Sequence, residues 1–327
     1  MVRKFKLMSM EESFEKMASY SETTSTHYDD LIVKLKNKIL TGKNIILSGP
    51  PGTGKTRIAF DILSTYKEEL GVEIMESIQF HPEYSYQDFI EGYSIVDGQY
   101  ERKNGVFIDF LDRVKSEGKN GLNILVIDEI NRADISSVFG ELLSLLDGGD
   151  REIILPISKR TIKADDRIVI IGTMNSADKN IAIMDFALRR RFDFLFVPPD
   201  YKGMTEWLNR YGFGFEHFKI FQYVKFAAEL NRRIGSAPML GKNMMIGQAL
   251  FVPKKLDNSQ IQISEICECL TDKVIPQIEA YLGIGNQALL GEILSPNIRS
   301  KVEQGVDIEE NDIVALVAAI STDKNDG

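Results

Sequence analysis

The fold of this 327-residue chain is decided by the stretch Gly49-Pro50-Pro51-Gly52-Thr53-Gly54-Lys55-Thr56. An apolar run at 44–47 precedes it and predicts a buried strand, and a helical pattern over 56–70 follows it. Glycines allow successive backbone N–H groups to turn inward around a phosphate, and the N-terminus of the helix adds partial positive charge. The spacing and its strand–loop–helix context predict a phosphate-binding P-loop rather than a chance glycine-rich turn.

Each part of the predicted loop has a chemical role. All eight residues from Gly49 to Thr56 are candidates for nucleotide binding. Lys55 would neutralise the β- and γ-phosphates, and the hydroxyl of Thr56 would be a ligand of Mg²⁺. The sequence therefore predicts a nucleoside triphosphate as the substrate and Mg²⁺ as the cofactor.

A second polar site follows the apolar run 124–127, which ends in Asp128 and Glu129. In a doubly wound parallel sheet, ligands bind beyond the carboxyl ends of the strands, so both acids should lie where the phosphate loop opens. Asp128 would hold Mg²⁺, directly or through water, and Glu129 would polarise the attacking water. A solvated acidic pair at a strand end is the simpler alternative, and the phosphate loop argues against it.

The residues after this strand end resemble a known family. The resemblance lies in Asp128-Glu129-Ile130-Asn131-Arg132-Ala133-Asp134, which is similar to the corresponding segment of AAA+ proteins of the MoxR and McrB branch. It implies an α/β nucleotide-binding core with a smaller helical lid domain, and hydrolysis within a ring of like subunits.

Another apolar run, 168–171, has a polar tip that ends at Asn175. In AAA+ proteins this place is the first sensor, a polar side chain near the γ-phosphate and the lytic water, and Asn175 fits that role with Asp178 close behind. The same Asn-x-x-Asp spacing is typical of the guanine-reading motif of small GTPases. We disfavour that interpretation because a residue at this strand tip faces the phosphates rather than the base.

The run 187–192 contains three successive arginines. A helix C-terminus favours cations, and a basic nucleic-acid patch is a second simple interpretation. The resemblance implies an arginine finger that stabilises transition-state charge in the neighbouring subunit. We expect Arg190 or Arg191 to be this finger and Arg189 to form a local ion pair.

The pattern of elements divides the chain near residue 200. Before it, apolar strands alternate with helices, which predicts a parallel sheet covered by helices on both faces. Beyond it, helical patterns dominate. Single helices are predicted over 56–70, 137–146, 182–191 and 263–282. The predicted parts are an N-terminal helical extension at 1–40, the AAA+ α/β domain at 41–200 and a mainly helical lid domain at 201–327.

Composition limits the class of protein. The net charge of −9 argues against a dedicated DNA-binding module, although contact with DNA through an assembly stays possible. Cys267 and Cys269 predict reduced thiols rather than a disulfide. The N-terminus lacks the long apolar run of a signal peptide, and no stretch is long enough to span a membrane, so we expect a cytoplasmic protein.

Longer segments are similar to McrB-type subunits of methyl-directed restriction systems. They are 79–92, 174–179 and 187–192. The resemblance implies a hexameric ring, a preference for GTP, a McrC-like partner that carries the nuclease, and DNA contact mainly through the assembly. Two departures are Lys179, where the family usually has arginine, and the lack of a clear second-sensor arginine, for which Lys242 is a weak candidate. About forty residues precede the first strand, and we expect them to be too few for an N-terminal DNA-recognition domain. Either this chain is a motor-only subunit, or the given sequence lacks the domain that reads modified DNA.

The leading hypothesis is therefore a GTP-hydrolysing AAA+ motor that drives DNA translocation for a McrC-like endonuclease. A MoxR-like ATPase chaperone that remodels protein complexes is the alternative, because the two share their phosphate chemistry. A non-enzymatic scaffold is a third possibility, and the full set of candidate catalytic residues argues against it. The residues that read the base are not predicted, beyond one candidate wall at 25–30.

Overall fold

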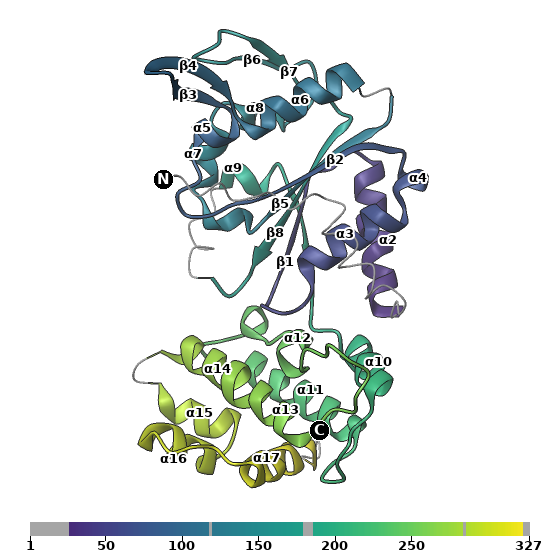
Figure 1. Cartoon of the computed structure of the whole chain (residues 1–327), viewed down its shortest axis with the longest axis vertical. Helices are drawn as coiled ribbons and strands as arrows, with labels where there is room; N and C mark the ends of the chain where they lie inside the picture. The colour runs from purple at the N-terminus through teal and green to yellow at the C-terminus, as the bar shows by residue number, and fades with distance from the viewer. Residues whose placement is uncertain (1–25, 118–119, 179–185, 284–285, 323–327) are drawn as a thin grey trace.

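The computed structural model describes residues 26–117, 120–178, 186–283 and 286–322. An α/β core and a helical region follow one another along the chain and lie at opposite ends of the long axis (Figure 1). The predicted extension before residue 26, Lys179 and the first part of the predicted helix 182–191 lie outside the described residues.

A five-stranded parallel sheet forms the centre of the core, in the order β2-β5-β8-β1-β9. Its strands are β1 (Ile45–Gly49), β2 (Val72–Gln79), β5 (Leu122–Asp128), β8 (Ile168–Asn175) and β9 (Asp193–Phe196). The three central strands are nearly continuous apolar runs because both faces of the sheet are covered. This order brings the carboxyl ends of β5, β8 and β1 side by side.

Helices cover the two faces of the sheet with alternate side chains of the same strands. On one face Ile45 and Leu47 pack with the apolar side chains of α2 and α3, whereas Ile46 on the other face packs with α6, α7 and α8. The helices of the core are α2 (Thr26–Leu40), α3 (Lys55–Thr65), α4 (Lys67–Leu70), α5 (Tyr86–Phe89), α6 (Val106–Glu117), a 3₁₀ turn η1 (Ile130–Arg132), α7 (Ile135–Phe139), α8 (Leu142–Leu145) and α9 (Phe186–Arg189).

Two hairpins extend from the core on the side away from the helical region (Figure 1). They are β3–β4 (Glu91–Val96 and Gln99–Asn104) and β6–β7 (Glu152–Ile154 and Thr161–Lys163). The buried carboxylate of Glu91 accepts hydrogen bonds from the backbone N–H groups of Ile157 and Ser158, at 2.7 and 3.1 Å. Glu91 therefore ties the base of the first hairpin to the turn of the second.

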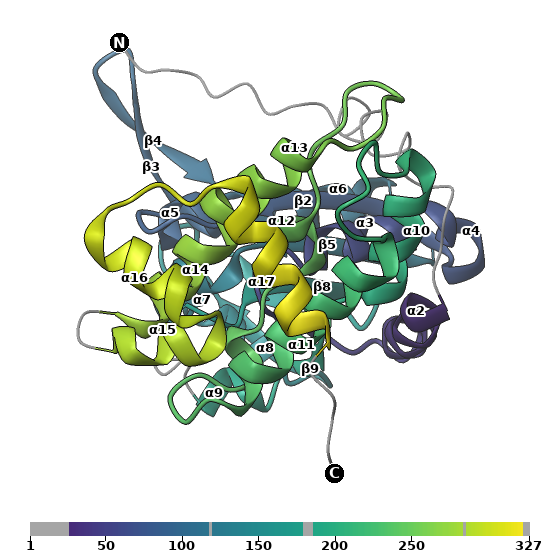
Figure 2. The same cartoon turned by 90° about the horizontal axis from the view of Figure 1, so that it is seen from below.

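The helical region, which Figure 2 shows from below, has an apolar core of its own. Its elements are α10 (Tyr201–Tyr211), α11 (Ile220–Ser236), a 3₁₀ turn η3 (Lys242–Met244), α12 (Gln248–Phe251), α13 (Ile263–Cys269), a π-helical turn η4 (Leu270–Val274), α14 (Ile275–Leu282), α15 (Gln287–Ile293), α16 (Pro296–Gln304) and α17 (Glu310–Thr322). Cys267 and Cys269 are free and buried here, consistent with the expected reduced thiols.

Two of the predicted single helices are interrupted, and a third is continuous but has an irregular middle turn. The helix expected over 56–70 breaks at Tyr66, which caps α3 and starts α4. The helix expected over 137–146 is wrong as one element, because Gly140 separates α7 from α8 with a φ of 49° that favours glycine. The pattern 263–282 forms one helical rod whose middle turn, η4, is π-helical.

Candidate nucleotide-binding site

The predicted phosphate loop joins β1 to α3. Gly52 and Gly54 have φ values of 77° and 85°, a left-handed conformation that glycine adopts without steric cost. Thr53 is fully buried, and its hydroxyl donates to the carbonyl oxygen of Pro50 at 3.0 Å. These contacts hold the loop as a preformed turn at the N-terminus of α3, where backbone N–H groups and the helix dipole favour an anion.

Lys55 lies inside this loop. Its ammonium group donates to the carbonyl oxygens of Gly49 and Pro50, at 3.0 and 2.8 Å. Burial lowers the pKa of Lys55 from 10.5 to about 8, although the charges of Glu129 and Asp128 act to raise it. The cation therefore faces the acidic end of β5, as the sheet order predicts.

The carboxylate of Asp128 lies at the centre of a small oxygen cluster. Thr56 donates its hydroxyl hydrogen bond to Asp128 Oδ1 at 2.7 Å, and the Thr173 hydroxyl donates to the same oxygen. Mg²⁺ prefers oxygen ligands and is often held by one or two protein groups with phosphates and waters. Thr56 and Asp128 fit this requirement as a pair that would share Mg²⁺ with phosphate oxygens and waters. Nowhere in the described ranges do three or more acidic, His or Cys side chains gather into a group that could hold a metal ion by themselves.

Glu129 follows Asp128 in an uncommon conformation. Its φ of 52° is left-handed for a non-glycine residue, and its N–H donates to the Thr173 hydroxyl at 3.1 Å. Its Oε2 atom is buried and forms no hydrogen bond, although the guanidinium of Arg132 lies 3.4 Å away. The backbone is thus fixed by Thr173 while the carboxylate keeps the capacity to accept a proton or a hydrogen bond.

Asn175 lies beside the first residue of the phosphate loop, because β1 and β8 pair Gly49 with Asn175. Its amide donates to Asp178 Oδ1 at 3.3 Å, and the amide of Asn131 donates to Asp178 Oδ2 at 3.3 Å. Asp178 therefore links the tip of β8 to the turn after β5. Thr173 and Asn131 were not predicted as site residues, although Asn131 belongs to the segment 128–134 and Thr173 to the polar tip that follows the run 168–171.

The arginines after α9 differ in burial. The side chain of Arg191 is 7% exposed and donates to Asp147 Oδ2 at 2.9 Å. The side chain of Arg190 is 64% exposed and lies 3.6 Å from the same oxygen, which Arg151 also approaches to 2.7 Å. Arg191 thus forms a local ion pair, which disfavours Arg191 and favours Arg190 as a group that reaches outward, while the ion pair expected for Arg189 stays a prediction.

The helical region touches the phosphate loop directly. The N–H of Gly247 donates to the carbonyl oxygen of Pro51 at 2.8 Å, and the N–H of Ala249 donates to that of Gly52 at 3.1 Å. The side-chain amide of Gln248 donates to the carbonyl oxygen of Thr53 at 3.1 Å. Lys242, the weak second-sensor candidate, lies over the ring of Phe196 at 5.2 Å.

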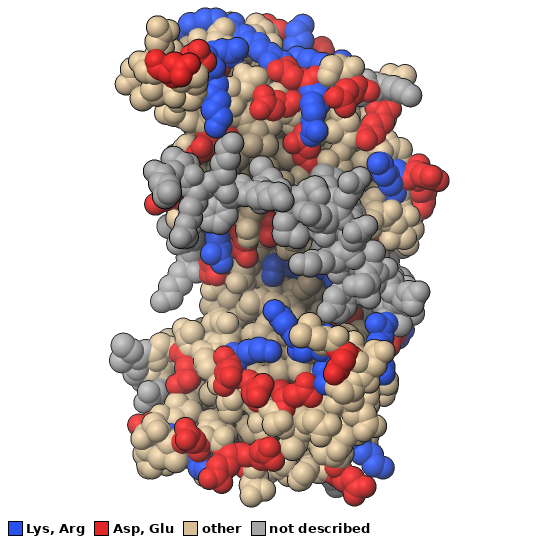
Figure 3. Space-filling view, in the orientation of Figure 1, with Lys and Arg blue, Asp and Glu red and all other residues tan. Residues whose placement is uncertain are grey.

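A cavity of about 300 Å³ opens beside this contact, between α3 of the core and α10 of the helical region. Gly52 and Gly54 form its edge, so it continues from the phosphate loop. Figure 3 shows Lys and Arg side chains where the two parts meet, whereas Asp and Glu dominate the shown face of the helical region. This distribution favours an anionic ligand at the junction.

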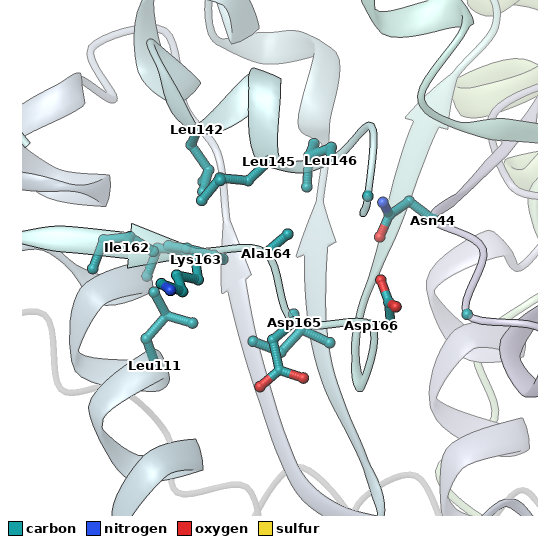
Figure 4. Close-up of a pocket in the computed structure, with 14 residues that line it drawn as sticks. Asn44, Leu111, Leu142, Leu145, Leu146, Ile162, Lys163, Ala164, Asp165 and Asp166 are labelled. Atoms are coloured by element: carbon teal, nitrogen blue, oxygen red, sulfur yellow. The ribbon is translucent and has the colours of Figure 1, made fainter. Parts of the chain in front are cut away.

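A smaller cavity of about 80 Å³ lies elsewhere in the core. Figure 4 shows its apolar wall of Leu142, Leu145 and Leu146 opposite Asn44 and Asp166. Asn44 precedes β1 and Asp166 precedes β8, so this cavity lies at the amino ends of the strands. Because ligands of such sheets bind at the carboxyl ends, we assign it no part in nucleotide binding.

The sheet order, the phosphate loop and the acidic end of β5 define a P-loop protein with an AAA domain. Residues 44–192 match the family described as "AAA domain (dynein-related subfamily)". None of the helices in the described ranges combines the length and apolar character needed to cross a bilayer.

The chain is similar to McrB-type subunits. It is 33% identical over 270 residues to the type IV methyl-directed restriction enzyme EcoKMcrB subunit of Escherichia coli K12, a match covering 76% of this chain and 56% of that protein. It is 26% identical to the type II restriction enzyme BsuMI component YdiS of Bacillus subtilis, over 71% of this chain and 79% of that protein. A proteasome-activating nucleotidase of Saccharolobus solfataricus is 32% identical over 52% of this chain and 38% of its own length.

The chain thus spans 56% of the length of the E. coli McrB subunit. The family match and these relatives support the AAA core.

Proposed function

We propose that this chain hydrolyses a nucleoside triphosphate with Mg²⁺, and that GTP rather than ATP is its substrate. The observation that carries the proposed hydrolysis is the convergence of Lys55, Thr56 and Asp128 with the strained residue Glu129 at the carboxyl ends of β1 and β5. The choice of GTP rests on the McrB-like segments of the sequence. Phosphoryl transfer to water needs a cation for the phosphates, oxygen ligands for a metal ion and a carboxylate to orient the water. Lys55, the pair Thr56 and Asp128, and Glu129, whose Oε2 atom is buried, supply these groups.

Each residue has a separate task in the proposed reaction. The phosphate loop and Lys55 bind the phosphates, while Thr56 and Asp128 hold Mg²⁺, which would neutralise phosphate charge when bound. Glu129 orients the attacking water and accepts its proton. Asn175, positioned through Asp178, donates a hydrogen bond towards the γ-phosphate or that water. Because Asp178 also accepts from Asn131, its orientation is fixed from two sides.

The proposed active form is a ring of like subunits, in which Arg190 completes the site of a neighbour. Support comes from the residues around Arg190, which hold its backbone in place. Leu188 and Phe192 are buried on either side of it, and Arg191 is paired with Asp147. Arg190 is thus exposed on a fixed backbone. A ring of six subunits is the arrangement that the McrB resemblance implies.

We further propose that the ring serves a McrC-like nuclease subunit and drives DNA translocation in the restriction of modified DNA. The similarities to the EcoKMcrB subunit and to the BsuMI component support this context. The net charge of −9 supports DNA contact through the assembly rather than through a large basic face of this chain. In this proposal residues 201–327 act as the lid over the nucleotide.

A MoxR-like ATPase that remodels protein complexes is the second candidate. The similarity to a proteasome-activating nucleotidase supports it, but covers 52% of the chain. The two candidates differ in base preference and in partner, because the phosphate chemistry is common to both.

The test is phosphate release by the purified chain with GTP and with ATP across a range of protein concentrations. We expect GTP to be preferred and activity per subunit to rise steeply with concentration, since Arg190 acts between subunits. Glu129→Gln should keep nucleotide binding and lower turnover by about 100-fold or more, while Glu303→Gln on the distant helix α16 should change neither. Turnover that survives in Glu129→Gln would exclude Glu129 as the base, and a preference for ATP would favour the second candidate.

A further inference from the structure

The cavity between α3 and α10 is placed to hold the nucleoside part of the nucleotide. It begins at Gly52 and Gly54 of the phosphate loop and has a volume of about 300 Å³, at the lower end of the range for small-molecule sites. A nucleotide whose phosphates lie in the loop extends its ribose and base into the adjoining space.

The walls of this cavity suit a flat aromatic ring. Ile58 of α3 lies on one side, and Met204 and Trp207 of α10 lie on the other. Ile58 and Met204 are buried, and Trp207 packs against the core of the helical region, so the walls are fixed by the packing of both parts. Apolar walls of this kind bind a base without distinguishing guanine from adenine, so discrimination must come from polar groups.

Two carboxylates line the cavity, and they differ in burial and in their hydrogen-bond partners. Asp200 is buried and caps α10, because its Oδ1 accepts the N–H of Gly203 at 3.0 Å. Asp61 lies on the second turn of α3 with its side chain 32% exposed, and its Oδ2 accepts from Arg57 Nε at 3.2 Å. An exposed pair at this i,i+4 spacing is weak, so the Asp61 carboxylate can turn to a ligand at little cost.

The other charged side chains of the cavity are donors. Arg57, Arg210, Lys254 and Lys255 line it, and Lys255 is paired with Glu265 at 3.1 Å. The carboxylate of Asp61 accepts hydrogen bonds, and the neighbouring arginine and lysine side chains donate them. This arrangement favours a base that has donors and an acceptor next to each other on one edge. Guanine has two adjacent donors, N1–H and the N2 amino group, next to the acceptor O6.

We propose that Asp61 selects the base, by accepting from N1–H and the N2 amino group of guanine while Arg57 donates to O6. This inference rests on the proposed function and names the group that would make GTP its substrate. Adenine has one amino group beside a ring nitrogen whose lone pair faces the carboxylate, so it satisfies fewer of these groups. A good bidentate contact to a base edge discriminates by about tenfold to a hundredfold.

The test is equilibrium binding of Mg²⁺ with GTP, ATP or xanthosine triphosphate to the full chain and to Asp61→Asn. In the variant we expect GTP affinity to fall by about tenfold to a hundredfold and ATP affinity to change by less than about threefold. Xanthosine triphosphate should bind the variant more tightly than the native chain, because xanthine has an oxygen at C2 that can accept from the asparagine amide.

A matched control is Glu303→Gln. Glu303 forms an i,i+4 ion pair with Arg299 at 2.8 Å, and its side chain is 32% exposed, as that of Asp61 is. This control should leave all three affinities unchanged. A GTP-to-ATP ratio in Asp61→Asn equal to that of the control would overturn the role of Asp61 and leave the proposed GTP hydrolysis standing. A native chain that binds neither nucleotide, or that prefers ATP, would instead overturn the proposed GTP specificity and this inference with it.

Discussion

Replacement of Gly247 by alanine is expected to detach the lid from the phosphate loop. The φ of Gly247 is −69°, which any residue adopts, so its backbone does not require glycine. Its surroundings do: a Cβ atom would lie 2.0 Å from the carbonyl carbon of Gly52 and 2.3 Å from the backbone nitrogen of Thr53. Both neighbours are backbone atoms of the loop, so no flexible side chain can move aside.

The size of the effect follows from these distances. Moving the Cβ from 2.0 Å to ordinary contact at 3.4 Å requires a displacement of about 1.4 Å. A shift of that size breaks the 2.8 Å hydrogen bond from Gly247 to Pro51 and the neighbouring bonds of Gln248 and Ala249. Each such bond contributes about 0.5–1.5 kcal/mol, so we expect lid docking to weaken by about 2–4 kcal/mol.

The assay is nucleotide binding to the full chain with Mg²⁺. Because the helical region forms one wall of the cavity proposed to hold the base, the loss of 2–4 kcal/mol should weaken affinity by about 30-fold or more. The matched control is Gly291→Ala in the lid helix α15, where the nearest atom to the new Cβ is Arg299 Cδ at 3.0 Å, on a flexible side chain. Circular dichroism should show folded protein for both. Native affinity in Gly247→Ala would refute the reasoning.

Two further predictions concern charge. The pKa of Lys55 is about 8, and phosphates bind its cationic form. Nucleotide affinity should therefore fall about tenfold from pH 7 to pH 9, and binding should be accompanied by proton uptake. Binding measured over this pH range should depend less on pH for Lys55→Arg, because arginine stays charged. Arg191→Ala should lower the free energy of unfolding by about 1–3 kcal/mol, whereas Arg190→Ala should change it by less than about 0.5 kcal/mol and lower turnover of the assembled protein about 1000-fold. Denaturant unfolding measures the change in stability, and phosphate release measures the change in turnover. If Arg190→Ala lowered stability and Arg191→Ala lowered turnover instead, the two arginines would have each other's role.

The parts of the fold that could be predicted are those fixed by local pattern. Buried strands such as 124–127 are apolar on both faces, which gives a strong signal, and the phosphate loop has a spacing that few other structures share. The break at Gly140 was also within reach, because a glycine inside an apolar helical pattern often marks a helix end.

Contacts between distant segments could not be predicted. The assignment of Arg191 to an ion pair depends on Asp147, which lies in the turn after α8. Arg191 differs from Arg190 in its lower exposure and its shorter distance to Asp147. Gln248 and the phosphate loop are 195 residues apart, so no spacing rule connects them. Thr173 was overlooked because a threonine in a strand is ordinary, and its importance comes only from the pairing of β8 with β5.

The lid is held at two points that flank the phosphate end of the site. Ser176, which follows Asn175, donates its hydroxyl hydrogen bond to the carbonyl oxygen of Asn243 at 2.9 Å, and four residues later Gly247 binds the phosphate loop. A single short segment of the lid therefore contacts both the sensor strand and the loop. Ser176 N–H also donates to the carbonyl oxygen of Gly49 at 2.8 Å. The residue that contacts Asn243 is therefore also bonded to the start of the phosphate loop, which Gly247 contacts. Any movement of β8 relative to the loop must shift one of these contacts, so under the proposed function events at the phosphates would alter the position of the helical region.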